Sequence, residues 1–286
     1  KLKMRRVRIN LLIITLVLMC IGVVMIYSAS SVWAQDRYRD DMFFLKRQLA
    51  FIAIGAFLAF MMMSFDYRAL RKYAKPLLIF SSVLLLFVLI PGLGREVGGA
   101  RRWFRFGIVS FQPSELANIV MLVYIADFIS RKKSQMKDLL NGFLPPLAVL
   151  GFTVLLILAQ PDLGSSMALA MIVFVLLLIA GADIKHLSGI VLLAIPVLYV
   201  LIFSVPYRRM RIMAFLNPWA DPKGSGFQLI QSNIALGSGG LFGIGLGQSN
   251  QKLFYLPAAH TDFIFSIIGE ELGLLGTLAV CILFII

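Results

Sequence analysis

Eight long apolar blocks recur along the 286 residues of this chain, and they restrict its fold more than any other feature. They run roughly over 9–29, 49–64, 76–91, 115–130, 144–159, 165–180, 187–205 and 263–286. Hydrophobic residues make up 60% of the chain and charged residues only 14%, whereas about 25% of a typical soluble domain is charged. A helix needs about 20 mostly apolar residues to cross a bilayer. The sequence therefore predicts an all-α integral membrane protein, a polytopic helical bundle with about eight transmembrane helices.

The ends of these blocks bear on how the chain is organised. No block shows the alternation of apolar and polar residues that a membrane β-barrel requires, so strands are not expected there. The first block follows a basic cluster, but it is too long for a signal peptide and lacks a small-residue cleavage site. We therefore expect a retained anchor, with 1–286 forming a single polytopic membrane domain. The last block reaches the final residue without a polar flank, which indicates that the chain stops in or just after a helix.

Lysine and arginine near the block ends predict the orientation in the membrane. A cytoplasmic N-terminus places 14 of the 27 basic residues inside and 13 outside. The five basic residues that precede the first block favour this orientation. The near-equal counts are informative, because outer segments normally avoid basic residues. Contact with anionic lipid headgroups is one explanation, and a site for an anionic ligand at the outer face is another. The net charge of +13 calls for no nucleic acid, since the basic residues are spread over short loops.

The first of two long outer loops, 92–112, interleaves arginines with aromatic residues. Arg101 and Arg102 directly precede Trp103. An interfacial aromatic belt with extended arginine side chains is one interpretation. The other is a re-entrant or amphipathic rim that holds a sugar or a pyrophosphate.

This loop leads into the motif 112–115, Gln-Pro-Ser-Glu, which resembles a helix start. Proline suits a first helical turn, and an acid is favoured there by the helix dipole. Glu115 also lies at the edge of the hydrocarbon, where a carboxylate is costly unless it is partnered. A similar start recurs at 160–165, where Asp162 is expected to cap the following helix.

The second outer loop, 206–260, is about 55 residues long, and loops of that length are usually functional or disordered. Its aromatic residues and turn signals argue against disorder. We expect short helices at the outer interface, with Arg208, Arg209 and Arg211 on a charged face. The stretch 237–247 holds six glycines but lacks the spacing of a nucleotide-binding loop, so it predicts a bend that allows close backbone approach.

Acidic residues in and beyond this loop carry two open questions. Asp221 is the only acid between Asp183 and Asp262. It is either an ordinary Asp-Pro turn or a general base above a basic site. Glu270 and Glu271 lie within the last span, where acids are rare. They are either functional or a structural clasp to another helix.

The motifs of the chain resemble the SEDS family (shape, elongation, division and sporulation) of integral-membrane peptidoglycan glycosyltransferases. The most specific stretches are 102–103 with 111–115, 217–222, 226–232, 237–241, 260–265 and 269–273. The likeness covers essentially the whole chain and is closer to the FtsW/SpoVE branch than to the RodA branch. The family fold has ten helices with a large outer loop after the seventh, so it implies that the last two are missing here.

The resemblance implies an enzyme that polymerises lipid II at the outer face of the bacterial cytoplasmic membrane. Asp221 matches the family's essential loop aspartate, which would deprotonate the acceptor's GlcNAc 4-hydroxyl while undecaprenyl pyrophosphate leaves with inversion. Arg101, Arg102 and Lys252 would stabilise the pyrophosphate, and Trp103 would hold a sugar or lipid. The full set expected to bind substrate is Arg101, Arg102, Trp103, Gln112, Ser114, Glu115, Asn118, Gln228, Gln231, Ser232, Lys252, His260, Thr261 and Asp262.

One position departs from the family pattern. Asn118 stands where members usually carry a lysine near the catalytic aspartate. An ammonium group would favour the charged aspartate, whereas an amide offers only a hydrogen bond. Arg102 is a candidate substitute.

The implied partners are lipid II, the nascent glycan strand, membrane lipids, a class B penicillin-binding protein, and divisome or elongasome proteins. No metal-ligand cluster is readable from the sequence, and a divalent cation, Mg or Mn, could share the charge work. Two other functions stay open at this point. A lipid II flippase or transporter would also place acids within its spans, and a scaffold for a transpeptidase would not need Asp221.

Overall fold

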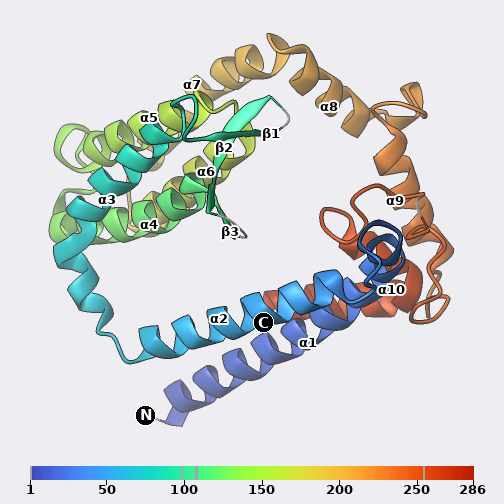
Figure 1. The fold of residues 1–286 in the computed structure, drawn as a ribbon. Coiled ribbons are helices and arrows are strands. Elements are labelled where there is room, and N and C mark those ends of the chain that lie inside the picture. The colour runs from blue at the N-terminus through green and yellow to red at the C-terminus, as the bar shows by residue number, and fades with distance from the viewer. Residues whose placement is uncertain (1, 98, 107–108, 254) are drawn as a thin grey trace. The chain divides into compact units, whose positions relative to one another are not determined.

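The computed structural model describes residues 2–97, 99–106, 109–253 and 255–286 (Figure 1). Lys1 of the basic cluster, Gly98, Gly107 and Ile108 of the first outer loop, and Phe254 of the second lie outside the described residues. Each predicted apolar block forms a helix. These are α1 (Leu2–Tyr38), α2 (Phe43–Met63), α3 (Leu70–Phe87), α4 (Pro113–Lys132), α5 (Leu144–Leu158), α6 (Leu163–Ile179), α7 (Ile184–Phe203) and α10 (Ile264–Ile285).

Not all eight helices have the length and apolar composition of a membrane span. Within the described residues, six do: α1, α2, α4, α7, α10 and the segment Leu139–Leu158, which contains α5. Helix α6 has 17 residues, and α3 carries three basic residues in its first turns. The prediction of an all-α polytopic membrane fold is confirmed, with six rather than eight helices that meet these two criteria.

The first outer loop contains strands that the sequence did not predict. β1 (Arg95–Val97), β2 (Ala100–Phe106) and β3 (Val109–Phe111) pair antiparallel in the order β1-β2-β3. In β2, arginine and aromatic residues occur on both faces, because Arg102 and Phe104 alternate with Arg101 and Trp103. The usual strand signal of one apolar and one polar face is therefore missing.

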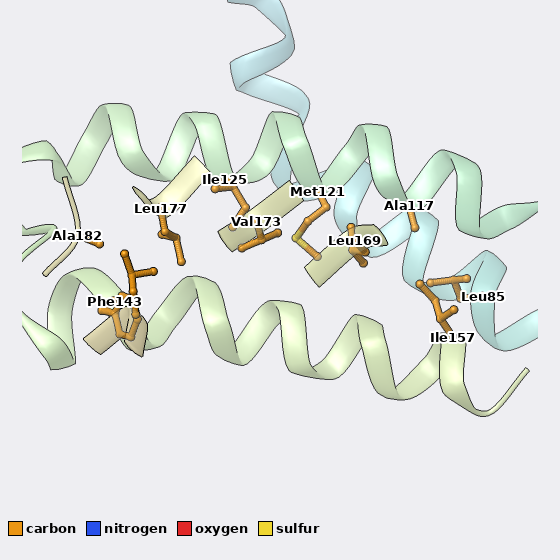
Figure 2. Packing of buried hydrophobic residues seen from close by; sticks show 11 residues of the cluster. Leu85, Ala117, Met121, Ile125, Phe143, Ile157, Leu169, Val173, Leu177 and Ala182 are labelled. Atoms are coloured by element: carbon orange, nitrogen blue, oxygen red, sulfur yellow. The ribbon is translucent and has the colours of Figure 1, made fainter. Parts of the chain in front are cut away.

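The chain divides into two compact units, 1–61 with 201–286 and 62–200. Each is described by itself, so the single membrane domain stays a prediction. In the second unit, an apolar core lies between α3, α4, α5 and α6 (Figure 2). Met121 and Ile125 on α4 meet Leu169 and Val173 on α6, and all four are fully buried. Their spacing of four residues places each pair on one face of its helix.

In the first unit, α1 packs against α10. Met25 and Ala29 of α1 are buried with Ile267 of α10 and with Leu256 from the long outer loop. That loop contains the predicted short helices, α8 (Pro206–Leu216) and α9 (Phe227–Ser238). Two of the three arginines of α8 make different contacts. Arg208 donates to the carbonyl of Leu201 at 2.9 Å, and the Arg211 guanidinium lies 4.6 Å from the Tyr207 ring.

Candidate functional site

Asp221 follows a 3₁₀ turn, Pro218–Ala220, and caps its C-terminal end. Its carboxylate accepts hydrogen bonds from the backbone N–H of Ser225 at 2.8 Å, from the Ser225 hydroxyl at 3.1 Å and from the N–H of Gly224 at 3.1 Å. These bonds favour the ionised form, so they hold the pKa of Asp221 below the ordinary value of 3.8. The side chain is exposed and charged, and its orientation is fixed by the turn.

The glycines of this turn are required by its geometry. A Cβ added to Gly224 would lie 2.7 Å from Oδ1 of Asp221 and closer still to Oδ2. A Cβ on Gly226 would come within 2.9 Å of the Asp221 carbonyl oxygen. The Asp-Pro turn that the sequence suggested is therefore present. The turn fills three of about four acceptor positions of the carboxylate and leaves capacity for a ligand hydroxyl.

Asp221 lines a cavity of about 400 Å³ between α8 and the turn. The polar part of its lining consists of Ser204, Arg209, Asn217, Asp221 and Ser225. Phe203, Met210 and Met213 are among its apolar walls. A cavity with a carboxylate, a guanidinium and an apolar wall suits a ligand that has both a polar head and a lipid tail.

Helix α9 carries three predicted binding residues directly after this turn. Gln228 is exposed and Gln231 is half-buried. The hydroxyl of Ser232 is buried and lies 2.6 Å from that of Ser266 on α10. Ser232 therefore joins two helices, while Gln228 is open to a ligand.

The glycine-rich stretch after α9 fits into a break in α10. Gly273 interrupts this helix with φ +69°, a conformation that favours glycine. The break frees backbone groups, which the loop satisfies: Ile244 N–H donates to Glu270 O at 3.0 Å, and Leu274 N–H donates to Gly240 O at 2.9 Å. Close approach of the two backbones confirms the predicted glycine bend.

Lys252 is buried, and its ammonium group is paired within the protein. Its ammonium donates to Glu271 at 2.9 Å, to the carbonyl of Gly247 at 2.7 Å and to the hydroxyl of Ser28 at 3.1 Å. Glu271 thus takes part in contacts between α10, α1 and the loop, as expected for a structural clasp, which is one of the two interpretations of Glu270 and Glu271.

His260 is half-buried against two aromatic side chains. Its ring centroid lies 5.4 Å from that of Trp33 and 4.6 Å from that of Phe44. Burial lowers the pKa of His260 below its ordinary value of 6.5. With Thr261 it lines a cavity of about 420 Å³ beside α1, and Asp262 is exposed next to it. Sequence reasoning missed Trp33, because a tryptophan near a helix end is typical of a membrane interface.

The other predicted site residues lie in the second unit. Arg102 donates from Nε to the Gln160 carbonyl at 3.2 Å and from Nη2 to the Pro161 carbonyl, and its Nη1 lies 3.7 Å from Asp162. Gln112 donates to the same Asp162 carboxylate at 3.3 Å. Asp162 also accepts from the Ser165 N–H at 3.1 Å, which confirms the predicted helix cap.

Around the start of α4, two polar atoms have no hydrogen-bond partner within the described part of the chain. They are the Ser114 hydroxyl and the Asn118 side-chain oxygen, both buried and one helical turn apart. Glu115 is exposed in the first turn of α4, as the predicted helix start requires. Arg101 pairs with Glu96 at 3.2 Å on the surface, and Trp103 is half-buried in β2. The approach of these residues to Asp221 stays a prediction.

Comparison with known proteins decides the family. The family of FtsW, RodA and SpoVE, described as cell cycle proteins, matches residues 8–286. The chain belongs to this family. It is 44% identical to the "Probable peptidoglycan glycosyltransferase FtsW" of Geobacter metallireducens over 99% of this chain and 76% of the relative. It is 46% identical to the "Stage V sporulation protein E" of Bacillus subtilis over 96% of this chain and 75% of the relative.

A solved structure agrees with this assignment. A chain from the structure "Structural coordination of polymerization and crosslinking by a peptidoglycan synthase complex" superimposes with a TM-score of 0.69. It is 32% identical, and the match covers 93% of this chain and 74% of that one. Among the described residues, no group of three or more His, Cys, Asp or Glu side chains could hold a metal ion.

Proposed function

We propose that this protein is a peptidoglycan glycosyltransferase that polymerises lipid II at the outer face of the bacterial cytoplasmic membrane, with its N-terminus in the cytoplasm. The relatives named for this activity support the class of reaction. The observation that carries the proposal is the fixed Asp221 carboxylate in a cavity with polar and apolar walls. A lipid-linked sugar presents these same two kinds of surface.

In the proposed reaction, Asp221 accepts the proton of the acceptor's GlcNAc 4-hydroxyl. The hydroxyl oxygen then bonds to the anomeric carbon of the donor, the bond from that carbon to the pyrophosphate oxygen breaks, and the centre inverts. Because its pKa is low, Asp221 is a weak base, and the proton moves as the attack makes the hydroxyl acidic. Undecaprenyl pyrophosphate leaves with the bonding electrons.

The leaving pyrophosphate needs cationic partners. Arg209 lines the cavity of Asp221, so we assign it this role. For Arg101 and Arg102, which belong to the second unit, the same role stays a prediction from the sequence. Lys252 could reach a phosphate only by leaving Glu271. A divalent cation, Mg or Mn, could share this charge; the described residues contain no group of three or more His, Cys, Asp or Glu side chains that could hold one.

The proposed partners follow from the relatives. A class B penicillin-binding protein would crosslink the strands that this chain makes, in a septum of division or sporulation. A solved relative from a peptidoglycan synthase complex, in which polymerization and crosslinking are coordinated, supports such a pairing.

The test is polymerisation of lipid II by the purified full-length protein and by Asp221→Ala. We expect at least a 100-fold loss of rate, in the range that loss of a general base produces. Asp36→Ala is the control, because Asp36 is an exposed acid of the same unit. Full activity of Asp221→Ala would remove Asp221 from the mechanism.

Transport of lipid II is the second candidate, because buried acids beside a broken helix are typical of transporters. Glu270 and Glu271 meet this description in α10. Fluorescent lipid II in sealed vesicles separates the two functions. Movement across the bilayer without polymer formation would favour transport.

A further inference from the structure

A buried polar network joins three segments of the first unit that lie far apart in the sequence. It contains Ser28 of α1, Ser249 and Lys252 of the outer loop, and Glu270 and Glu271 of α10. The Ser28 hydroxyl donates to both oxygens of Glu271, at 2.7 and 2.8 Å. Lys252 pairs with the same carboxylate at 2.9 Å, and both side chains are almost fully buried. All five side chains are at least nine-tenths buried, so none of these contacts is a solvated surface pair.

The second carboxylate holds the loop through its backbone. Glu270 accepts a hydrogen bond from the Ser249 hydroxyl, and it accepts the N–H of Asn250 at 3.1 Å and of Gln251 at 3.4 Å. The backbone carbonyls of Glu270 and Glu271 accept from Ile244 and Gly245. The segment 244–252 is therefore fixed to α10 by both the main chain and the side chains of the same two residues.

Two cavities lie beside this network. Lys252 lines both of them. On one side lies the cavity of about 420 Å³ with Trp33 and His260. On the other lies a cavity of about 450 Å³ whose lining includes Tyr27, Ser31 and Gln248.

The same part of α10 is connected to the turn of Asp221. Helix α9 starts directly after that turn and is joined to α10 by the Ser232–Ser266 hydrogen bond. Gly239 at the end of α9 approaches the backbone of Gly269, leaving no room for a side chain. A shift of α10 around Glu271 would therefore be transmitted to α9 and to the turn.

We propose that Lys252 and Glu271 are positioning residues for the glycosyl transfer, acting through the loop and α9 rather than by contact with a phosphate. This inference rests on the proposed function. Removing one partner leaves the other charge without its ion-pair partner in a buried site, which forces the segments apart. Removing both leaves the Glu270 carboxylate, which keeps its hydrogen bonds from the loop. The single variants and the double variant should therefore behave oppositely.

The experiment compares Lys252→Met, Glu271→Gln and the double variant in the full-length protein in nanodiscs, with lipid II as substrate. We expect each single variant to lower kcat at least 10-fold and to change KM less than about 3-fold. The double variant should recover most of kcat, because the amide oxygen that replaces a carboxylate oxygen of Glu271 can still accept from the Ser28 hydroxyl and from the backbone N–H of Ser249, which lies 3.4 Å from Glu271 in the wild type. Lys46→Met is the control, since Lys46 forms an exposed ion pair with Asp40 in the same unit.

A contact between Lys252 and the phosphate predicts a different pattern. Lys252→Met and the double variant would then be equally inactive, while Glu271→Gln would keep its activity, and our proposal would be overturned. Thermal unfolding supplies a readout that does not depend on activity. The single variants should unfold at lower temperature and the double variant near the wild type. If wild type forms no polymer, the proposed function fails, but unfolding still tests the coupling of the pair.

Discussion

Substituting Gly224 by alanine tests whether the position of the Asp221 carboxylate controls the rate. The new Cβ would lie 2.7 Å from Oδ1 and 2.8 Å from Cγ of Asp221, and closer still to Oδ2. Ordinary van der Waals contact begins at 3.4 Å. The difference, 3.4 minus 2.7, means that the carboxylate or the turn must move by at least about 0.7 Å.

This displacement is large on the scale that catalysis tolerates. A misplacement of about 1 Å can cost about 100-fold in rate, because the reacting groups no longer meet in line. We therefore expect Gly224→Ala to lower the rate of lipid II polymerisation by about 10- to 100-fold. The hydrogen bonds from residues 224 and 225 that lower the pKa of Asp221 should weaken as well.

The assay is the initial rate of glycan formation at saturating lipid II, with protein amount and thermal unfolding measured in parallel. Gly237→Ala is the matched control, because a Cβ there meets nothing within 4 Å. If Gly224→Ala folds and polymerises like the wild type, then either the carboxylate can move freely or Asp221 is not the base. The inference from this turn would then be wrong.

Three further predictions concern the fold and the pH dependence. Asp162→Ala should cost about 1 kcal/mol through loss of the α6 cap, whereas Asp162→Asn, which keeps an acceptor for Ser165, should cost less in thermal unfolding. Leu169→Ala should destabilise the α4–α6 core by about 2–5 kcal/mol, because Leu169 is fully buried; a smaller loss in denaturant unfolding would show that the core collapses into the space. Since the pKa of Asp221 is lowered from 3.8, its charge is lost only below that value. Titration of Asp221 should therefore cause no fall in the wild-type rate between about pH 8 and pH 5, and the shape of the pH–rate profile of Asp221→Asn should match that of the wild type in this range.

The helices could be predicted because long apolar blocks have few alternatives in a membrane chain. Their ends could not, since α1 runs to Tyr38, well past its apolar block. Its last turns are held by aromatic packing: the Tyr38 ring stacks on Phe43 at 4.0 Å, and Trp33 contacts Phe44 at 5.6 Å. Such contacts depend on which residues meet in space, and hydropathy does not record them.

The structure gives the contacts of the predicted site residues, and some of these contacts could not be expected from the sequence. Asp162 caps a helix as expected, and Lys252, which the sequence also marked, is paired with the buried Glu271. The spacing along the chain could not show this, because Lys252 and Glu271 are brought together by the glycine loop and the break at Gly273. The surroundings of Asn118 could not be predicted from the sequence either. Its buried side-chain oxygen has no hydrogen-bond partner among the described residues.

The two interpretations of Asp221 are compatible, and the structure shows why. The hydrogen bonds that make it an ordinary Asp-Pro turn also fix the direction of its carboxylate and keep it charged. As the proposed base, Asp221 would already be oriented and would lose little freedom when the acceptor hydroxyl arrives, so the turn would lower the entropic cost of the reaction. The same bonds would make the proposed base weaker, which would place the remaining demand on the cations proposed to stabilise the leaving pyrophosphate. Arg209, which lines the cavity of Asp221, is therefore the side chain whose loss should most nearly equal the loss of Asp221 itself.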